Sequence, residues 1–292
     1  MTQRNVVITQ YKRTPIGNFG GSLAKMSPVN IGTHCLSNLV SEHPFLKDQT
    51  DLVIVGNVLS AGHGQNIARQ TSIFSGINES TPAFTLNHVC GSGMQAIITA
   101  SHYIQTGNAD IVIAGGTESM SQASFCMPSH RWGNKMGHDQ LVDTMIKDGL
   151  WDAFDNTHMG ITAENVAKKY NISREEQDEY AFNSHQKAIF AQEKGFFENE
   201  IYPVKIKSKK KESVFSKDEF IRHDICKDKL ASLRPVFDTN GSVTAGNSSG
   251  LNDGAAFVVL MSESKAKELN MPTNFSLKNS TTVGYSPTLM GV

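Results

Sequence analysis

The sequence predicts an α/β fold built from layers of strands and helices. Three runs, 51–56, 110–116 and 255–261, are mostly apolar and of strand length. Continuous runs of this kind are typical of strands that are buried on both faces of a sheet. Before the first run and between the first and second, apolar residues recur at helical spacing, at 31–40 and at 94–104. Strands that alternate with helices in this way indicate a layered α/β domain.

Further elements are predicted along the chain. We expect strands at 5–9 and at 281–285, and helices at 160–170, at 174–194 and directly after Ser262. Ser173 and Glu176 have the spacing of a capping box at the start of the 174–194 helix. The apolar faces that we expect are Met94, Ile97, Ile98 and Ile104 in one helix, and Ala163, Val166, Ala167 and Tyr170 in another.

The composition excludes several classes of protein. The chain has 292 residues, of which 39% are hydrophobic and 19% charged, so it can bury a sizeable core. The net charge of −1 gives no basic field for nucleic acid or a membrane surface. No stretch is long enough to span a bilayer, and the apolar run 6–8 is too short for the core of a signal peptide.

The cysteines point to a reducing compartment. Cys35, Cys90, Cys126 and Cys226 are scattered, and none belongs to a Cys-x-x-Cys pair or to a Cys/His set with zinc spacing. We therefore expect free thiols, no metal and a cytoplasmic location.

Cys90 is the first candidate for chemistry. It lies in Asn-His-Val-Cys-Gly-Ser-Gly-Met-Gln-Ala-Ile, residues 87–97, which reads as a loop that leads into a helix. The free N–H groups and the dipole of a helix N-terminus favour an anion, and the thiolate is the nucleophilic form of cysteine. The alternative is a buried structural cysteine, which behaves as a small hydrophobic residue.

A glycine-punctuated segment at 243–256 is the second candidate. It reads Val-Thr-Ala-Gly-Asn-Ser-Ser-Gly-Leu-Asn-Asp-Gly-Ala-Ala and leads into the buried strand 255–261. Its glycines would let the backbone approach a ligand closely, although a plain loop between strands is the alternative. A third segment, Arg-Thr-Pro-Ile-Gly at 13–17, is sufficiently explained as a turn built from Pro and Gly.

Both long motifs resemble those of the thiolase family, in particular the biosynthetic acetyl-CoA acetyltransferases. The resemblance runs over essentially the whole chain, and thiolases also carry an Arg-Thr-Pro-x-Gly segment. It implies a layered αβα fold in which 1–119 form the N-terminal half and 249–271 return to it. Residues 120–248 would form a loop domain for coenzyme A binding and oligomer contacts, and 272–292 would begin a largely missing C-terminal half.

The resemblance also implies the roles of individual residues. Cys90 would be the nucleophile that holds the acetyl group. Ser249 would donate a hydrogen bond to the pantetheine arm of coenzyme A, and Arg222 would pack on its adenine end. The remaining positions that match the coenzyme A pocket are Leu150, His158, Met159, Phe237 and Ala245. Coenzyme A and acetyl-CoA would be substrates, with no permanently bound cofactor.

The implied reaction is the condensation of two acetyl-CoA molecules to acetoacetyl-CoA, and thiolysis in reverse. The partners would be these two thioesters, and the full-length enzyme would be a homodimer or homotetramer. Thiolases continue for roughly another hundred residues, with Asn-Glu-Ala-Phe, Gly-His-Pro and Cys-Gly-Gly-Gly motifs that this sequence lacks. Those motifs carry the base that activates the nucleophile and the acid/base for the α-carbon, so the gene product is truncated or the sequence is a part of the enzyme.

Two alternatives stay open on this basis. The chain could be a catalytically incomplete acyl-CoA-binding fragment or scaffold, since the C-terminal His and Cys are missing. It could also be another condensing enzyme, such as a ketoacyl synthase. The segment around His158 and the 243–256 motif favour a thiolase over the ketoacyl synthase.

Overall fold

The computed structural model describes residues 4–207 and 212–292, which form two compact units. Unit 1 comprises residues 1–144, 200–219 and 252–281, and unit 2 comprises 145–199, 220–251 and 282–292.

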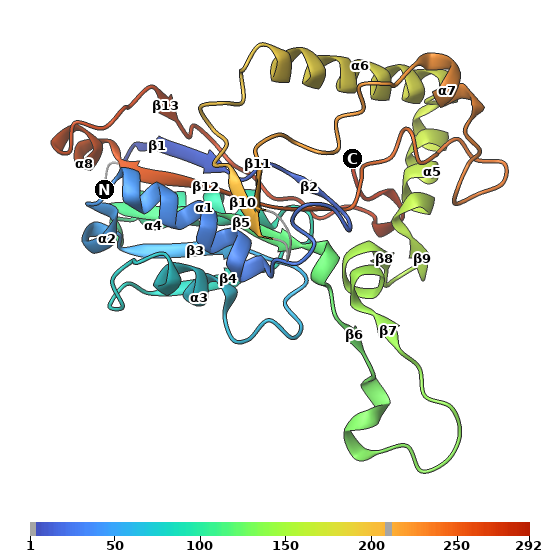
Figure 1. The fold of residues 1–292 in the computed structure, drawn as a ribbon, viewed down its shortest axis with the longest axis horizontal. Coiled ribbons are helices and arrows are strands. Elements are labelled where there is room, and N and C mark those ends of the chain that lie inside the picture. Colours follow the sequence, from blue (N-terminus) through green and yellow to red (C-terminus); the bar gives the residue numbers. More distant parts are fainter. Residues whose placement is uncertain (1–3, 208–211) are drawn as a thin grey trace. The chain divides into compact units, whose positions relative to one another are not determined.

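Unit 1 is built on a mixed seven-stranded sheet of the order β13-β1-β12-β5-β3-β4, with β2 paired to β12 (Figure 1). Strands β3, β4 and β5 run parallel, whereas β1 and β12 are antiparallel to their neighbours. The bounds of the strands are β1 Val6–Arg13, β2 Gly17–Asn18, β3 Leu52–Gly56, β4 Ala83–Leu86, β5 Ile111–Ser119, β12 Asn252–Ser262 and β13 Phe275–Ser276.

Helices cover both faces of this sheet. The longer ones are α1 Pro28–Glu42, α3 Ile67–Phe74 and α4 Ser92–Gln105, and the short ones are α2 Leu46–Gln49 and α8 Glu263–Glu268. Alternate residues of β5 point to opposite faces, so Ile111 and Ile113 pack with α1 and α3 while Val112 and Ala114 pack with α4. This two-sided burial explains why β3 is apolar throughout.

The buried strands predicted at 51–56, 110–116 and 255–261 are present as β3, β5 and β12. The first strand is longer than expected, because Gln10, Lys12 and Arg13 end the apolar pattern without ending the pairing with β12. The strand expected at 281–285 is wrong. Those residues have no regular structure, and the edge strand β13 lies earlier, at Phe275–Ser276, where it pairs with β1.

The face that α4 buries also differs from the expectation. Met94 is 67% exposed, and the buried positions are small residues such as Ala96 and Ala100, followed by Ile104. The reason is close packing against the sheet: a Cβ atom on Gly56 would lie 2.6 Å from the carbonyl carbon of Ser92. Small side chains fit such an approach, whereas a methionine must point away from it.

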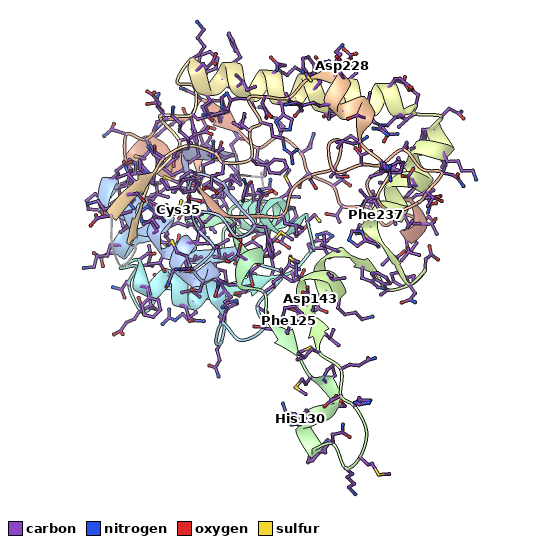
Figure 2. All side chains as sticks on the ribbon, turned by 45° about the vertical axis from the view of Figure 1, so that its right-hand side comes forward. Cys35, Phe125, His130, Asp143, Asp228 and Phe237 are labelled. Atoms are coloured by element: carbon purple, nitrogen blue, oxygen red, sulfur yellow. The ribbon has the colours of Figure 1, made fainter. Side chains whose placement is uncertain are left out.

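An arm and a hairpin complete unit 1. The arm consists of the 3₁₀ turn Met120–Gln122, β6 Phe125–Cys126, the 3₁₀ turn Pro128–Trp132 and β7 Val142–Asp143. Phe125 pairs with Asp143 near its base, and His130 lies near its tip (Figure 2). The hairpin pairs β10 Val204–Lys207 with β11 Glu212–Phe215 and contributes Val204 and Phe215 to the core.

Unit 2 is mostly helical. It contains a π-helical turn Met145–Leu150, the short strands β8 Trp151–Asp152 and β9 Thr157–His158, the helices α5 Met159–Tyr170, α6 Arg174–Glu193 and α7 Lys227–Ser232, and a 3₁₀ turn Pro287–Leu289. The capping box of Ser173 and Glu176 is present at the start of α6.

The apolar stripe predicted for α5 is only partly correct. Ala167 is buried, but Ala163 and Tyr170 are exposed, and the other buried positions are Gly160 and Thr162. The buried side is set by close contacts that periodicity does not report, because Gly160 lies directly against the Phe237 ring.

Candidate active site

Cys90 lies on an exposed, strained turn just before α4, whose N-cap residue is Gly91. The preceding residue, Val89, has φ of 47°, a left-handed conformation that a β-branched residue rarely adopts. Strain of this kind persists only where the surroundings enforce it, and it is concentrated at functional sites.

Hydrogen bonds enforce the turn from several directions. The Ser92 hydroxyl accepts from the His88 N–H at 2.8 Å and donates to the Val89 carbonyl at 2.6 Å. The Val89 N–H donates to the Asn87 side chain at 2.8 Å. The local sequence around Cys90 thus builds a rigid turn that presents the thiol to solvent at a helix N-terminus.

The other cysteines have different surroundings. All four are free thiols, and Cys126 and Cys226 are partly buried. Cys35 lies in the core of unit 1, where burial raises the pKa of its thiol to about 12. Cys35 therefore stays protonated and inert at neutral pH.

His158 caps α5 in unit 2. Its Nδ1 accepts a hydrogen bond from the Gly160 N–H at 3.0 Å, and its ring stacks on Phe237 with the centroids 4.6 Å apart. Burial lowers the pKa of His158, so the neutral ring is favoured. Because Nδ1 is an acceptor, the proton of the neutral ring resides on Nε2 and can be donated.

Ser249 lines an open groove of about 350 Å³ in unit 2. Part of the wall comes from α6, where Tyr180, Ser184 and Ala188 recur every four residues, and part from Phe220 and Ile221. The Arg222 guanidinium lies 5.7 Å from the centroid of the Phe220 ring, and the Arg222 N–H donates to Nδ1 of His185 at 3.2 Å.

The loop that carries Ser249 is held in shape by acidic side chains of two helices. The Glu164 carboxylate accepts from the N–H groups of Ser242 and Val243 at 2.9 and 2.7 Å. Asp178 accepts from the Asn247 amide at 3.0 Å and from Arg174 Nε at 2.8 Å. These contacts lie entirely within unit 2, so its own side chains hold the shape of the loop.

The remaining predicted positions also lie in unit 2. Met159 follows His158 and is half-buried, Leu150 ends the π-helical turn, and Ala245 is exposed in the loop. The structure thus places Ser249 in the lining of the groove and Arg222 beside the lining residue Phe220. His158 is stacked on Phe237, and Cys90 belongs to unit 1. Their roles toward coenzyme A stay predictions.

Sequence reasoning missed His185, Asn247 and Asp178. The four-residue spacing of Tyr180, Ser184 and Ala188 was the available signal for a ligand-facing side of α6. Among residues 4–207 and 212–292, no cluster of three His, Cys, Asp or Glu could hold a metal ion. Over the same residues, no helix is both long and apolar enough to cross a membrane.

Comparisons with known proteins give the family of the chain. Residues 6–264 match the family model of the thiolase N-terminal domain. An acetyl-CoA acetyltransferase of Allochromatium vinosum is 51% identical over 288 residues, which are 98% of this chain and 73% of that protein. A probable acetyl-CoA acyltransferase of Staphylococcus aureus strain COL is 48% identical with the same coverage.

A solved structure is also similar. The crystal structure of the Bacillus anthracis acetyl-CoA acetyltransferase matches with a TM-score of 0.89 and 44% identity, over 93% of this chain and 68% of that one. Family model, relatives and fold agree, and the chain belongs to the thiolase family of acyltransferases.

Proposed function

We propose that this chain is an acetyl-CoA C-acetyltransferase that works through an acetyl group on Cys90. The observation that carries the proposal is the exposed thiol on a strained, hydrogen-bonded turn at the start of α4. An accessible thiol at a helix N-terminus has the properties that a nucleophile in covalent catalysis needs.

In the first half-reaction, the Cys90 thiolate attacks the carbonyl carbon of acetyl-CoA. The bond from that carbon to the coenzyme A sulfur breaks, coenzyme A leaves as a thiolate that takes up a proton, and the acetyl group stays on Cys90. In the second half-reaction, a general base takes a proton from the methyl carbon of another acetyl-CoA, and this carbon attacks the acetyl group. A carbon–carbon bond forms, the Cys90 sulfur leaves, and acetoacetyl-CoA is released; thiolysis is the reverse.

Each attack places negative charge on a thioester oxygen, and preorganised N–H donors stabilise such charge. We assign the backbone N–H of Cys90 as one donor, because the hydrogen bonds around Ser92 fix the orientation of this peptide segment. A fixed donor needs no reorganisation when the charge develops.

We assign coenzyme A to the groove of unit 2. The exposed Ser249 hydroxyl is available to the pantetheine arm, and the Arg222 guanidinium beside Phe220 offers a flat surface for the adenine. His158, Met159, Phe237, Leu150 and Ala245 would line the remainder of the path. The Nε2–H of neutral His158 would serve as a donor to a ligand oxygen.

We further propose that the arm of unit 1 mediates homo-oligomer contacts, as a dimer or tetramer. Trp132 and Met136 on the arm are 90% and 94% exposed. Large exposed apolar side chains favour an interaction surface on this arm. The four free thiols fit a reducing cytoplasm, which we propose as the location.

Exchange of labelled coenzyme A into acetyl-CoA tests the first half-reaction, because only acetyl transfer to the protein and back is needed. We expect exchange with the wild-type chain and none with Cys90→Ala, while Cys126→Ala serves as the matched control. Exchange that survives Cys90→Ala would refute the proposal. Loss of acetoacetyl-CoA enolate absorbance on addition of coenzyme A then distinguishes a complete acetyltransferase from a catalytically incomplete acyl-CoA-binding protein.

A further inference from the structure

Arg13 forms ion pairs with Glu200 and Asp218 in unit 1. It lies at the end of β1, with its side chain only 17% exposed. Its Nε donates to Glu200 at 2.7 Å, and its two terminal nitrogens donate to the two oxygens of Asp218 at 2.8 and 3.0 Å. This bidentate geometry is the strongest that a guanidinium and a carboxylate form.

The two carboxylates lie near the two ends of one segment of unit 1. Glu200 is the first residue of the 200–219 segment of unit 1, and Asp218 is next to its last residue. Two backbone hydrogen bonds also join Arg13 to the start of this segment. The Arg13 N–H donates to the Glu200 carbonyl and the Tyr202 N–H donates to the Arg13 carbonyl, both at 2.8 Å. Arg13 thus holds both ends of the segment from which the chain continues into unit 2.

The neighbouring Glu219 is held by the loop that follows β1. Its carboxylate accepts from the Asn18 N–H at 2.8 Å, from the Ser22 N–H at 3.2 Å, and from the Ser22 hydroxyl. Asp218 also accepts from the Ile16 N–H at 2.8 Å. The Arg-Thr-Pro-Ile-Gly segment is therefore more than a turn, since Arg13 and Ile16 both donate to Asp218 and Arg13 also donates to Glu200.

Phe220 follows Glu219 directly and lines the groove of unit 2. It lies 6.1 Å from the His185 ring between centroids, and two residues later the Arg222 N–H bonds to His185. We propose that Arg13, Asp218 and Glu219 are positioning residues that fix the backbone at the start of 220–222 and so shape the groove for coenzyme A. The inference rests on the proposed function, because it assigns coenzyme A to this groove.

Two substitutions perturb the anchor that Arg13, Asp218 and Glu219 form, each in a different way. Arg13→Gln removes the charge and the bidentate contact. Gly21→Ala leaves Arg13 intact, but the new Cβ atom would collide with Glu219 Oε2 and displace its carboxylate, and Gly21 has no positive φ that would strain alanine. Arg4→Gln is the matched control, because it breaks an ion pair with Asp110 elsewhere in unit 1.

Hydrogen–deuterium exchange measures how firmly the anchor holds the backbone of 220–225, and it needs no ligand. We expect Arg13→Gln and Gly21→Ala to raise deuterium uptake in peptides that cover 220–225, where the Arg222 N–H is bonded to His185. Peptides from β5 should be unchanged, and Arg4→Gln should leave 220–225 at the wild-type uptake. Unchanged uptake at 220–225 in either anchor variant that folds would overturn the inference.

Titration with coenzyme A then tests the link to binding. We expect the dissociation constant to rise about threefold to tenfold in both anchor variants, within the range that coupling through packed networks reaches, and Arg13→Lys to fall between them and wild type. The rate of Cys90 alkylation should stay at the wild-type value, which a general loss of structure would not allow. If exchange responds but the wild-type chain binds no coenzyme A, the proposed binding site is refuted while the anchor of 220–222 stands.

Discussion

Gly160→Ala is the sharpest test of the packing around His158. Gly160 is the second residue of α5, and a Cβ atom there would come within 3.0 Å of the Phe237 ring, a distance that real Cβ atoms essentially never show. Because the ring is stacked on His158, it cannot retreat without changing that contact.

The expected magnitude follows from two opposing terms. Overpacking costs about 1–3 kcal/mol, whereas replacing glycine by alanine in a helix gains at most about 1 kcal/mol. The steric term wins, so we expect Gly160→Ala to lower the free energy of unfolding by roughly 1–2 kcal/mol. Displacement of Phe237 should also weaken coenzyme A binding if His158 lies on its path.

Gly93→Ala is the matched control, since Gly93 is the second residue of α4 and nothing lies within 4 Å of the new Cβ atom. Gly93→Ala has the same gain in helix propensity without a steric clash, so the variant should not be less stable than wild type. Urea denaturation followed by circular dichroism measures both variants. A Gly160→Ala protein as stable as Gly93→Ala, with unchanged coenzyme A affinity, would show that Phe237 does not pack against α5 in solution.

Three further predictions concern the thiols and the groove. Brief iodoacetamide treatment with peptide mapping should label Cys90 first and Cys35 last, because Cys35 is buried with a pKa of about 12; faster labelling of Cys126 or Cys226 would contradict the assignment. Ser249→Ala and His158→Ala should each weaken coenzyme A binding by about 0.5–1.5 kcal/mol in titration calorimetry, and unchanged affinity in both would exclude the groove. In an NMR titration, His158 should have its midpoint below the usual value of about 6.5, since burial lowers its pKa, and Phe237→Ala should move it back up. Because folding lowers its pKa, His158 contributes to the stability of the folded state at pH values above its unfolded pKa, and this contribution is lost as the pH falls through its folded pKa. A midpoint above 6.5 would contradict this prediction.

The central sheet was predictable because the patterns that specify its strands lie within short stretches of the sequence. The strands β3, β5 and β12 have apolar runs of the right length, and the capping box of α6 specifies its own start. The position of Cys90 just before α4 also followed from the glycines and the helical spacing behind it, whereas its exposure did not.

What could not be predicted depends on contacts between distant residues. The 281–285 run has a strand-like composition but does not form a strand, whereas the shorter β13 pairs with β1. The Arg13–Asp218 pair joins residues 205 positions apart, so the motif at 13–17 looks like a simple turn in the sequence. The same holds for Asn247 and Asp178, which meet only once α6 and the loop have folded.

Intact mass measurement after incubation with acetyl-CoA, followed by peptide mapping, tests whether Cys90 carries the acetyl group. We expect a mass increase of one acetyl group, located on the peptide that contains Cys90 and absent from Cys90→Ala, while Cys126→Ala still carries it. An acetyl group on a different residue, or a wild-type protein that stays unmodified while Cys90 is freely alkylated by iodoacetamide, would contradict the account.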